Sequence, residues 1–280
     1  MAFMRIVTHA GQAHRDEVLA CAVALAYFPS IVIIDRRDPT AEELEDKDVL
    51  VLDVGGEHNP EKGNFDHHQL ARDAAPACAF SLLVEWLGLS AKFALLSYFE
   101  STKIMDSKGP MALAKHLGLA NPSAIFANMS PIEGAIVSMF EKAESWYLYG
   151  EHPMFEMLRE LGHQLSGYAE ERWGQQQWLQ AHARVVAVGG VEVLIIENTN
   201  TEGVQQFRDA VHPGAAVSVS WDDRGAGWAL YRFNDHSHVD FSRVASDPRV
   251  GFAHNAGFIA KTRERISEVE VLALVQGALK

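Results

Sequence analysis

Short apolar runs alternate with helical patterns in the first part of the chain. Residues Arg5–Thr8, Ile31–Ile34 and Val49–Leu52 are four-residue runs rich in β-branched and aliphatic side chains, which predicts buried strands. Between them, Glu17–Phe28 carries apolar residues at helical spacing, and Pro39–Asp46 follows an aspartate suited to a helix N-cap. This alternation of strand and helix predicts a parallel sheet with helices on both faces.

A long helical region follows. Residues 81–178 are mostly helical in pattern, with breaks near four prolines. The last helix repeats apolar side chains at intervals of three and four, at Phe155, Leu158, Leu161, Leu165 and Tyr168. Such spacing is typical of an amphipathic helix, and we expect this helix to join two domains.

The pattern changes to hairpins near Arg184. Val185–Val188 and Val191–Ile196 flank a Gly-Gly pair, which is a two-residue turn signal. Val217–Trp221 and Trp228–Phe233 flank a longer turn, Asp222–Gly227. A closing helix is predicted with an apolar face formed by Ile266, Val269, Leu272 and Val275.

These patterns predict an α/β fold in two parts. A doubly wound, mostly parallel sheet domain occupies residues 1–150, a linking helix occupies 151–183, and a smaller α+β domain occupies 184–280. A chain of 280 residues exceeds the usual size of one domain, so two separate cores are expected.

Composition narrows the class of protein. With 48% hydrophobic and 22% charged residues, the chain has the balance of a globular protein, which excludes disordered and fibrous classes. The formal net charge of −13 argues against a broad basic face for long nucleic acid, although a groove for a short one remains open.

Cysteine usage and the N-terminal sequence bear on the cellular location of the protein. Cys21 and Cys78 lie in apolar contexts without metal-type spacing, so both are expected to be buried packing residues rather than a disulfide pair. The N-terminal segment lacks the pattern of a secretory signal, and no apolar run approaches the ~20 residues that span a bilayer. We therefore expect a cytoplasmic protein.

Metal-type side chains follow the predicted strands of the first domain. His9, His14 and Asp16 come after the first strand, Asp53 ends the third, and Asp66-His67-His68 lies in the loop region soon after. Since the carboxyl ends of parallel strands share one edge of a sheet, these residues are expected to converge there. Imidazole and carboxylate together suit first-row metals such as Mn, Fe, Co or Zn.

A shared carboxylate in such a cluster would allow a two-metal site. Two ions about 3.5–4 Å apart can clamp a phosphate and generate hydroxide between them, which hydrolyses phosphoesters or phosphoanhydrides. The cluster therefore predicts a metal-dependent hydrolase.

The order of these residues resembles a known group of enzymes. His9, His14-Arg15-Asp16, Asp53, Asp66-His67-His68 and Asp106 are similar to the four motifs of the Asp-His-His phosphoesterase superfamily. A closer resemblance is to the melanocyte-proliferating-gene family of exonuclease-like proteins, carried by Thr8–Glu17, Arg37–Pro39, Asp53–Gly56, Phe65–Gln69 and His254–Ile259.

The resemblance implies a 3′→5′ exonuclease on RNA, or a related phosphodiesterase, that uses two divalent ions, in first place Mn, with Mg, Co or Zn as other candidates. Asp53 would bridge both ions and His68 would contact phosphate. The implied metal ligands are His9, His14, Asp16, Asp53, His67 and Asp106. The sequence departs from the family by keeping one acid around Asp106 and by having Ala10 and Ala13 in place of Asn and an aromatic residue.

Three further residues are candidates for substrate binding. Arg15 lies beside the ligands and would either hold a phosphate or pair with Glu17, while His254 and Gly257 would approach the substrate from the second domain. Asp66 is expected to orient His68 or a neighbouring ligand, since metal-bound imidazoles need acceptors behind them.

Three classes of function stay open from the sequence. The first is a phosphodiesterase or exonuclease on short RNA or oligonucleotides. The second is a small-molecule phosphatase or pyrophosphatase on the same site, and the third is a non-catalytic metal- or nucleotide-binding protein. A homodimer is expected only because dimers are common.

Overall fold

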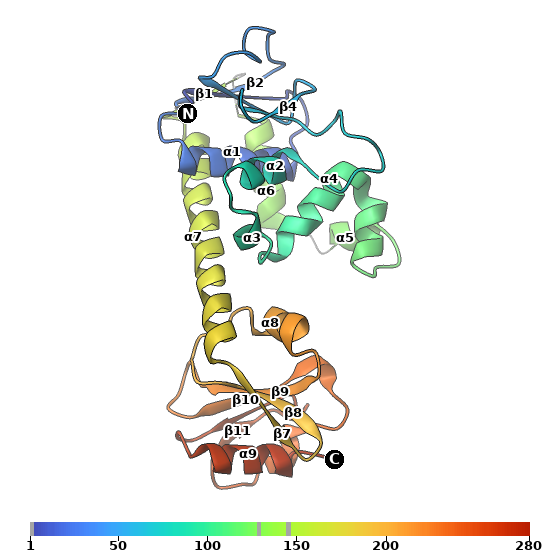
Figure 1. Cartoon of the computed structure of the whole chain (residues 1–280), viewed down its shortest axis with the longest axis vertical. Coiled ribbons are helices and arrows are strands. Elements are labelled where there is room, and N and C mark those ends of the chain that lie inside the picture. Colours follow the sequence, from blue (N-terminus) through green and yellow to red (C-terminus); the bar gives the residue numbers. More distant parts are fainter. Residues whose placement is uncertain (1–2, 128–129, 144–146) are drawn as a thin grey trace. The chain divides into compact units, whose positions relative to one another are not determined.

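The computed structural model describes residues 3–127, 130–143 and 147–280, and the start of the N-terminal segment, Met1 and Ala2, lies outside them. The chain divides into two compact units, Met1–Glu170 and Glu171–Lys280, which we call unit 1 and unit 2 (Figure 1). Among the described residues, no helix combines the length and the apolar character needed to cross a membrane.

Unit 1 is built on a mostly parallel sheet. Strand β1 pairs in parallel with β2 on one side and β3 on the other, and β5 continues the parallel set beside β3, while β4 and β6 are antiparallel edge strands. The sheet order is β4-β5-β3-β1-β2-β6. The strands are β1 (Arg5–Thr8), β2 (Ile33–Arg36), β3 (Val49–Leu52), β4 (His58–Asn59), β5 (Asn64–Phe65) and β6 (Tyr147–Tyr149).

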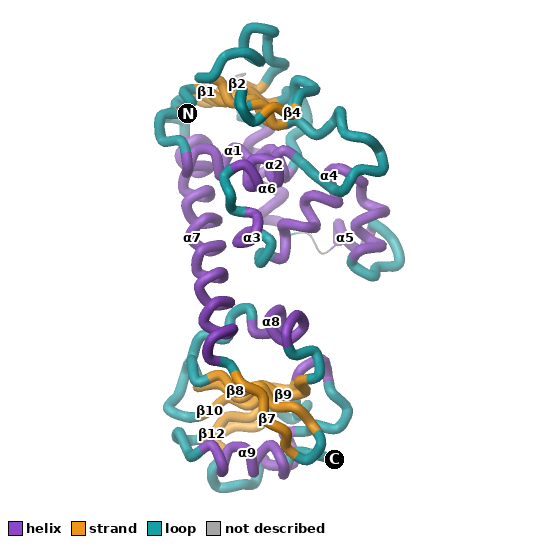
Figure 2. The backbone as a smooth tube through the Cα atoms, in the orientation of Figure 1, coloured by secondary structure: helices purple, strands orange, loops and turns teal. Residues whose placement is uncertain are grey.

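Helices cover one face of this sheet (Figures 1 and 2). Ile6, Leu50 and Leu52 point into the main core on that face, together with residues of α1, α2, α6 and α7. The helices are α1 (Arg15–Tyr27), α2 (Ala79–Trp86), α3 (Ser90–Phe93), α4 (Ser97–His116), α5 (Ser123–Ala127), α6 (Pro131–Glu141) and α7 (Pro153–His182), the last of which continues into unit 2. The α/β class and the parallel sheet predicted from the sequence are confirmed.

On the other face of the sheet, the helix predicted over Pro39–Asp46 is absent. Val7, Val49 and Val51 pack there against Leu44, which belongs to the segment expected as the helix Pro39–Asp46. This segment forms consecutive turns instead of a helix. Thr40 and Glu43 form the reciprocal contacts that start a helix, and Arg37 holds Glu43. A new turn at Asp46, which accepts from Asp48 and Val49, ends the segment before a helix propagates.

Two strand predictions also needed correction. The second strand begins at Ile33 rather than Ile31, because the chain turns where Ile31 donates to the Phe28 carbonyl, and it extends through Asp35 and Arg36. Both polar residues are buried with ionic partners, which an apolar run does not signal. The edge strand β6 lies within the region predicted as helical and pairs with β2.

Helix α7 packs closely on α1. Phe155 and Leu158 are buried, and Leu161 and Leu165 pack against the main core, whereas Tyr168 is exposed and Ala169 takes its place in the core. A Cβ atom at Gly162 would lie 1.8 Å from the carbonyl oxygen of Ala22. A glycine is therefore required where the two helix backbones meet.

Unit 2 is an α+β unit, as predicted. Its sheet has the order β11-β12-β10-β9-β8-β7, in which only β8 and β9 are parallel among the described pairs, and α8 connects these two. The elements are β7 (Arg184–Val188), β8 (Val191–Ile196), α8 (Val204–Val211), β9 (Ala215–Trp221), β10 (Trp228–Arg232), β11 (Val250–Ala253), β12 (Ile259–Thr262) and α9 (Glu268–Gly277). Both predicted hairpins are present.

The buried face of α9 differs from the predicted one. Val269 is 79% exposed, whereas Val271, Leu274 and Val275 are buried in the unit 2 core. The expected face repeated strictly every three residues, a spacing that drifts around a helix of 3.6 residues per turn. A capping box between Ser267 and Glu270 fixes where the helix starts.

Candidate metal centre

The register of the sheet brings three strand ends together. Thr8 of β1 is paired with Leu52 of β3, and Leu52 is paired with Phe65 of β5. The residues that follow these pairs are His9, Asp53 and Asp66. Because the three strands are parallel, these side chains leave the sheet at the same edge.

Asp53 occupies an unusual backbone conformation at the centre of this edge. Its φ angle is 59°, in the left-handed region that residues other than glycine rarely adopt, and its side chain is almost fully buried. The main-chain N–H of Asp53 donates to the Phe65 carbonyl at 3.1 Å. Such conformations persist where the surrounding structure fixes them, and they concentrate at functional sites.

Two groups of potential metal ligands share Asp53 and contain the six expected residues. The first group is His9, His14 and Asp53, and the second is Asp16, Asp53, His67 and Asp106. A third group, Asp53, His67 and His68, overlaps the second. Within each group the donor atoms lie within 4.8 Å of one another. The structure therefore brings together all six residues expected as ligands, and Asp53 is common to these groups.

The distances around Asp53 are short. Nε2 of His67 lies 3.2 Å from Oδ1 of Asp53 and 2.7 Å from Oδ2 of Asp106. On the other side, Nε2 of His9 lies 3.4 Å from Oδ2 of Asp53 and also contacts the Glu17 carboxylate. The two oxygens of Asp53 thus face different imidazoles.

The donor atoms fit a cation. Both carboxylate oxygens of Asp16 are buried and have no hydrogen-bond partner among the described residues. An unpartnered buried carboxylate is costly, so these oxygens require a positive charge between them. The mixture of imidazole and carboxylate donors matches Mn, Fe, Co or Zn.

The pKa values show the same electrostatic imbalance. Burial, with the nearby carboxylates of Asp53 and Asp106, raises the pKa of Asp16 well above its ordinary value. Burial alone would lower the pKa of His9 and His67, but the hydrogen bonds that they donate to neighbouring carboxylates outweigh it and raise these values to about 11 and about 10. The two histidines in turn overcome the effect of burial on Asp53 and lower its pKa to about 2.

Asp66 holds the loop that carries the two histidines. Its Oδ1 atom accepts from the N–H of His68 at 3.0 Å and lies 2.7 Å from Nδ1 of the same residue, while Oδ2 accepts from the N–H of Gly56 at 2.7 Å. The ring of His68 is therefore fixed at Nδ1, and its side chain remains 62% exposed. Asp66 has the orienting role expected for it, toward His68.

Glu17 and Arg36 were not identified as site residues from the sequence. Glu17 is fully buried, and its carboxylate contacts His9 through one oxygen and Arg36 at 3.1 Å through the other. Arg36 also donates to the Gly11 carbonyl and lies over the ring of Phe140. The position of Glu17 in the first turn of α1, next to Asp16, was the available signal.

The remaining candidates lie in different places. Arg15 pairs with Glu133 of α6 at 2.5 Å and not with Glu17. His254 and Gly257 lie in one loop of unit 2, where Nδ1 of His254 accepts from the N–H of Ala256, and Gly257 has a φ of 69° with Asp240 against it. Their role toward a substrate stays a prediction.

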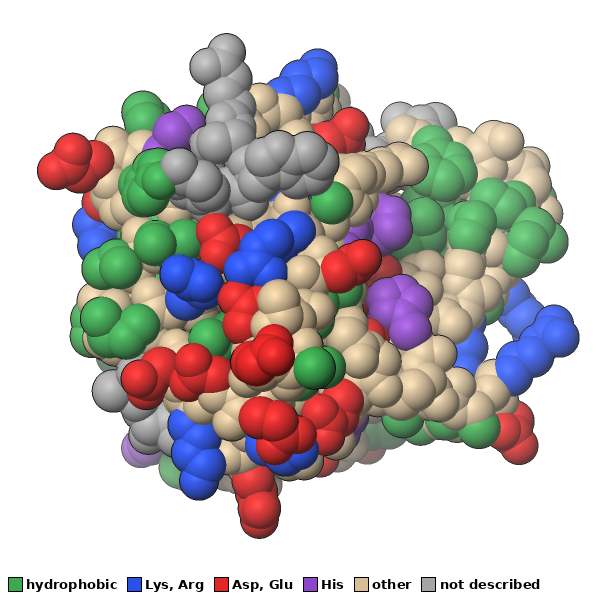
Figure 3. Space-filling view, turned by 90° about the horizontal axis from the view of Figure 1, so that it is seen from above, with side chains coloured by type: hydrophobic (Ala, Val, Ile, Leu, Met, Phe, Trp, Pro, Cys, Tyr) green, Lys and Arg blue, Asp and Glu red, His purple; other side chains and the backbone are tan. Residues whose placement is uncertain are grey.

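Charged side chains are intermixed over the face of the molecule seen in Figure 3, where histidines also reach the surface. No broad basic patch is present among the side chains coloured in this view. This agrees with the net charge of −13.

Similarity to known proteins is concentrated in this part of the chain. Residues 5–77 match the model of the MYG1_exonuc family, described as "Uncharacterised protein family (UPF0160)". The "MYG1 exonuclease" of Rattus norvegicus is 46% identical over 71 residues, which is 25% of this chain and 18% of the rat protein. The "MYG1 protein" of Chlamydia pneumoniae is 39% identical over 80 residues, 28% of this chain and 27% of that protein.

Solved structures with some likeness are more distant. RecJ of Thermus thermophilus in complex with Mg²⁺ has a TM-score of 0.32 and 12% identity, covering 97% of this chain and 49% of RecJ. A putative family II inorganic pyrophosphatase of Methanococcus jannaschii has a TM-score of 0.22 and 12% identity, covering 98% of this chain and 99% of the pyrophosphatase. The resemblance to the MYG1 family that the motifs indicated is thus confirmed over residues 5–77, which contain five of the six expected metal ligands.

Proposed function

We propose that this chain is a metal-dependent phosphoester hydrolase that acts as a 3′→5′ exoribonuclease or phosphodiesterase on short RNA. The observation that carries the proposal is the sharing of Asp53, which is almost fully buried, between two groups of imidazole and carboxylate donors. A shared carboxylate is the arrangement that holds two ions against one phosphate.

The two groups would hold one ion each. His9, His14 and Asp53 would form the first position, and Asp16, His67 and Asp106, again with Asp53, would form the second. When bound, two Mn ions would polarise the scissile phosphate and lower the pKa of water at the site. The buried carboxylates explain why a cation is needed, since the opposing charges described around Asp53 are the imidazoles of His9, His67 and, at 3.9 Å, His68.

The protein side chains would complete the chemistry. Asp66 accepts from Nδ1 of His68, so Nε2 of His68 is the atom left to face a substrate. Nε2 would stabilise the phosphate and deliver a proton to the leaving oxygen, a role that needs an imidazole held in one orientation. Nδ1 of His9 lies 2.9 Å from the Ala10 carbonyl oxygen, and this main-chain contact would fix the ring from behind. The Glu17 carboxylate, held by Arg36, contacts Nε2, the atom that also faces Asp53.

The relatives support a hydrolase of the nuclease type. The rat, mouse, human and bovine relatives are named MYG1 exonuclease, and the matched segment contains every motif described above except that of Asp106 and that of His254. The match covers only 18% of those proteins, so the activity of the whole relative is proposed for this chain and not carried over.

The test begins with protein stripped of metal and reloaded with Mn. It would be incubated with an RNA oligomer labelled at either end, the matching DNA oligomer, a dinucleotide and pyrophosphate. Stepwise release of mononucleotides from the 3′ end of RNA supports the proposal. Cleavage of pyrophosphate alone would assign a small-molecule phosphatase, and two bound Mn ions without any turnover would assign a metal-binding protein.

A further inference from the structure

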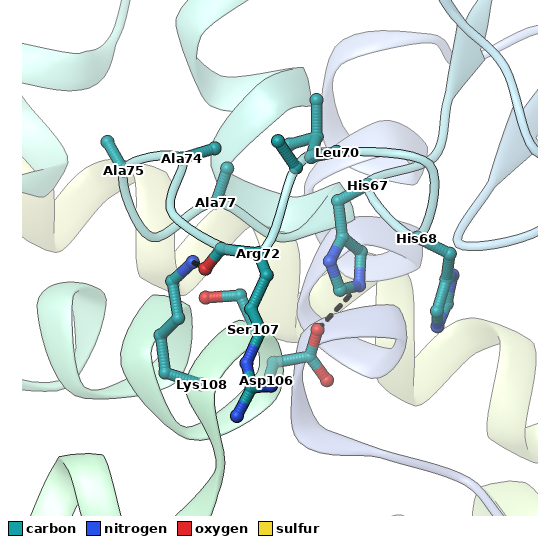
Figure 4. Close-up of a pocket in the computed structure, with 11 residues that line it drawn as sticks. His67, His68, Leu70, Arg72, Ala74, Ala75, Ala77, Asp106, Ser107 and Lys108 are labelled. Atoms are coloured by element: carbon teal, nitrogen blue, oxygen red, sulfur yellow. Dashed lines mark hydrogen bonds and ion pairs between the residues drawn. The ribbon is translucent and has the colours of Figure 1, made fainter.

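A cavity lies directly beside the second metal position. It has a volume of about 310 Å³ and is lined on one side by His67, His68 and Asp106. The opposite wall is the loop from Leu70 to Ala77, with Ser107 and Lys108 of α4 closing the cavity (Figure 4). A phosphate held at the metal ligands would therefore have its neighbouring group in this cavity.

Two cationic side chains line the cavity. Lys108 donates from Nζ to the main-chain oxygen of Arg72 at 2.8 Å, which ties α4 to the loop. An ammonium group has three donors, so two remain for a ligand. The guanidinium group of Arg72 has no hydrogen-bond or ionic partner among the described residues, and Asp106 is the one carboxylate among the described lining residues.

The rest of the lining offers small side chains rather than a large aromatic platform for base stacking. Four of the lining side chains are alanines, Ala71, Ala74, Ala75 and Ala77, and no Phe, Tyr or Trp is among the described lining residues. Sites that hold a nucleobase normally offer an aromatic platform. Small walls with two cations suit a compact anion instead.

We infer that Arg72 and Lys108 form a subsite for a second phosphate group, the one next to the scissile phosphate. The inference rests on the proposed function for the position of the scissile phosphate. Guanidinium and ammonium groups are the standard partners of phosphate oxygens, and their gathering here stands out in a chain with a net charge of −13. The subsite selects substrates with two successive phosphates over isolated phosphoesters.

The second phosphate has two possible sources, an oligonucleotide backbone or a phosphoanhydride. The substrates pApA and ApA differ only in a terminal 5′ phosphate, so they test the oligonucleotide source. Pyrophosphate has a second phosphate and p-nitrophenyl phosphate has none, so this pair tests the phosphoanhydride source.

The variants are Arg72→Gln and Lys108→Gln. Arg72→Gln is the safer one structurally, because the contact from Lys108 uses the main-chain oxygen and survives the substitution. Lys115→Gln, exposed on the same helix outside the cavity, is the matched control.

We expect each variant to raise KM for pApA by about tenfold to a hundredfold, the effect of losing one charge-assisted hydrogen bond, while ApA is cleaved as by the unaltered protein. An effect confined to the pyrophosphate pair would assign the anhydride as the source. Equal effects on both members of each pair, or none, would overturn the subsite.

A binding measurement separates this inference from the proposed function. Calorimetric titration of the Mn-loaded protein with methylenediphosphonate and methylphosphonate needs no turnover. The unaltered protein should prefer the diphosphonate, and the Arg72→Gln, Lys108→Gln double variant should lose that preference by about tenfold or more. A preference that persists in the double variant would overturn the subsite even if the chain proves to be an RNase, whereas absence of all hydrolysis would overturn only the proposed function.

Discussion

Nε2 of His67 lies 2.7 Å from Oδ2 of Asp106, although His67 follows strand β5 and Asp106 is carried by helix α4. Asp106 is the one acid of the segment Lys103–Lys108. The same Nε2 atom of His67 also faces Oδ1 of Asp53, at 3.2 Å, and the two carboxylates belong to one donor group. The segment therefore contributes a carboxylate to the second donor group.

Replacing Asp53 by asparagine should remove the bridge without unfolding the chain. Asparagine has the same shape and tolerates the left-handed backbone that Asp53 adopts, with φ at 59°. Turnover should fall by more than the roughly 10–100-fold that loss of an outer partner costs. Mn-dependent hydrolysis and thermal melting followed by circular dichroism provide the two readouts. Retained activity, with a normal melting curve, would remove the bridging role.

Asp106→Asn and His14→Asn should each affect a different ion. Asp106 belongs only to the second donor group and His14 only to the first. Asp53 is the residue that the two groups share. Calorimetric titration with Mn should show two sites in the unaltered protein and one strong site in each variant. The double variant should retain neither. If either single variant still binds two ions with unchanged affinity, that residue is not a ligand.

Replacing Glu17 by glutamine should destabilise unit 1. The change leaves the buried guanidinium of Arg36 with a neutral partner at a site where both side chains are at most 7% exposed. We expect the free energy of unfolding to fall by about 1–3 kcal/mol, measured by urea denaturation of metal-free protein. The matched control is Glu133→Gln, which breaks the more exposed pair with Arg15 and should cost less than about 1 kcal/mol. Equal losses would show that the buried pair has no special role.

Metal binding should release protons and strengthen as pH rises. In the metal-free protein the neighbouring carboxylates overcome burial and hold His9 protonated up to a pKa of about 11 and His67 up to about 10. A metal ion needs the neutral imidazole, so it must displace these protons. Mn titrations at pH 6.5, 7.5 and 8.5, in buffers with different enthalpies of ionisation, should show proton release and rising affinity. Affinity that does not change with pH would contradict the assignment.

The same pKa values predict the pH dependence of stability without metal. The folded pKa of both histidines lies above the unfolded value of about 6.5. Their contribution to stability is therefore full below about pH 6.5, declines above it, and is lost as pH rises through about 10 to 11. Urea denaturation of metal-free protein should show this decline, and Mn-loaded protein should not.

Gly162→Ala should weaken the packing of α7 on α1. The added Cβ would lie 1.8 Å from the Ala22 carbonyl oxygen, so the helices must separate, at a cost of about 1–3 kcal/mol or more. Gly167→Ala on the same helix meets nothing within 4 Å and should instead stabilise the protein by about 0.5–1 kcal/mol. Opposite signs in thermal denaturation would confirm the close approach, and a neutral Gly162→Ala would refute it.

The sequence by itself determined the types of donor and the edge of the sheet where they lie. The strands β1 and β3 are signalled by local runs, and a parallel arrangement places His9 and Asp53 after them at one edge, because parallel strands end on the same side. Those conclusions need only neighbouring residues and the direction of each strand.

Tertiary structure decided how these donors are shared. The division of the ligands about Asp53, the arrival of Asp106 from α4 and the buried pair of Glu17 with Arg36 depend on contacts between distant segments. It also decided that Leu44 covers the sheet from a turn and that α9 buries Val271 in place of Val269. Local periodicity gives an element its type, but the direction of a side chain and the partner it meets follow from packing, which no short pattern contains.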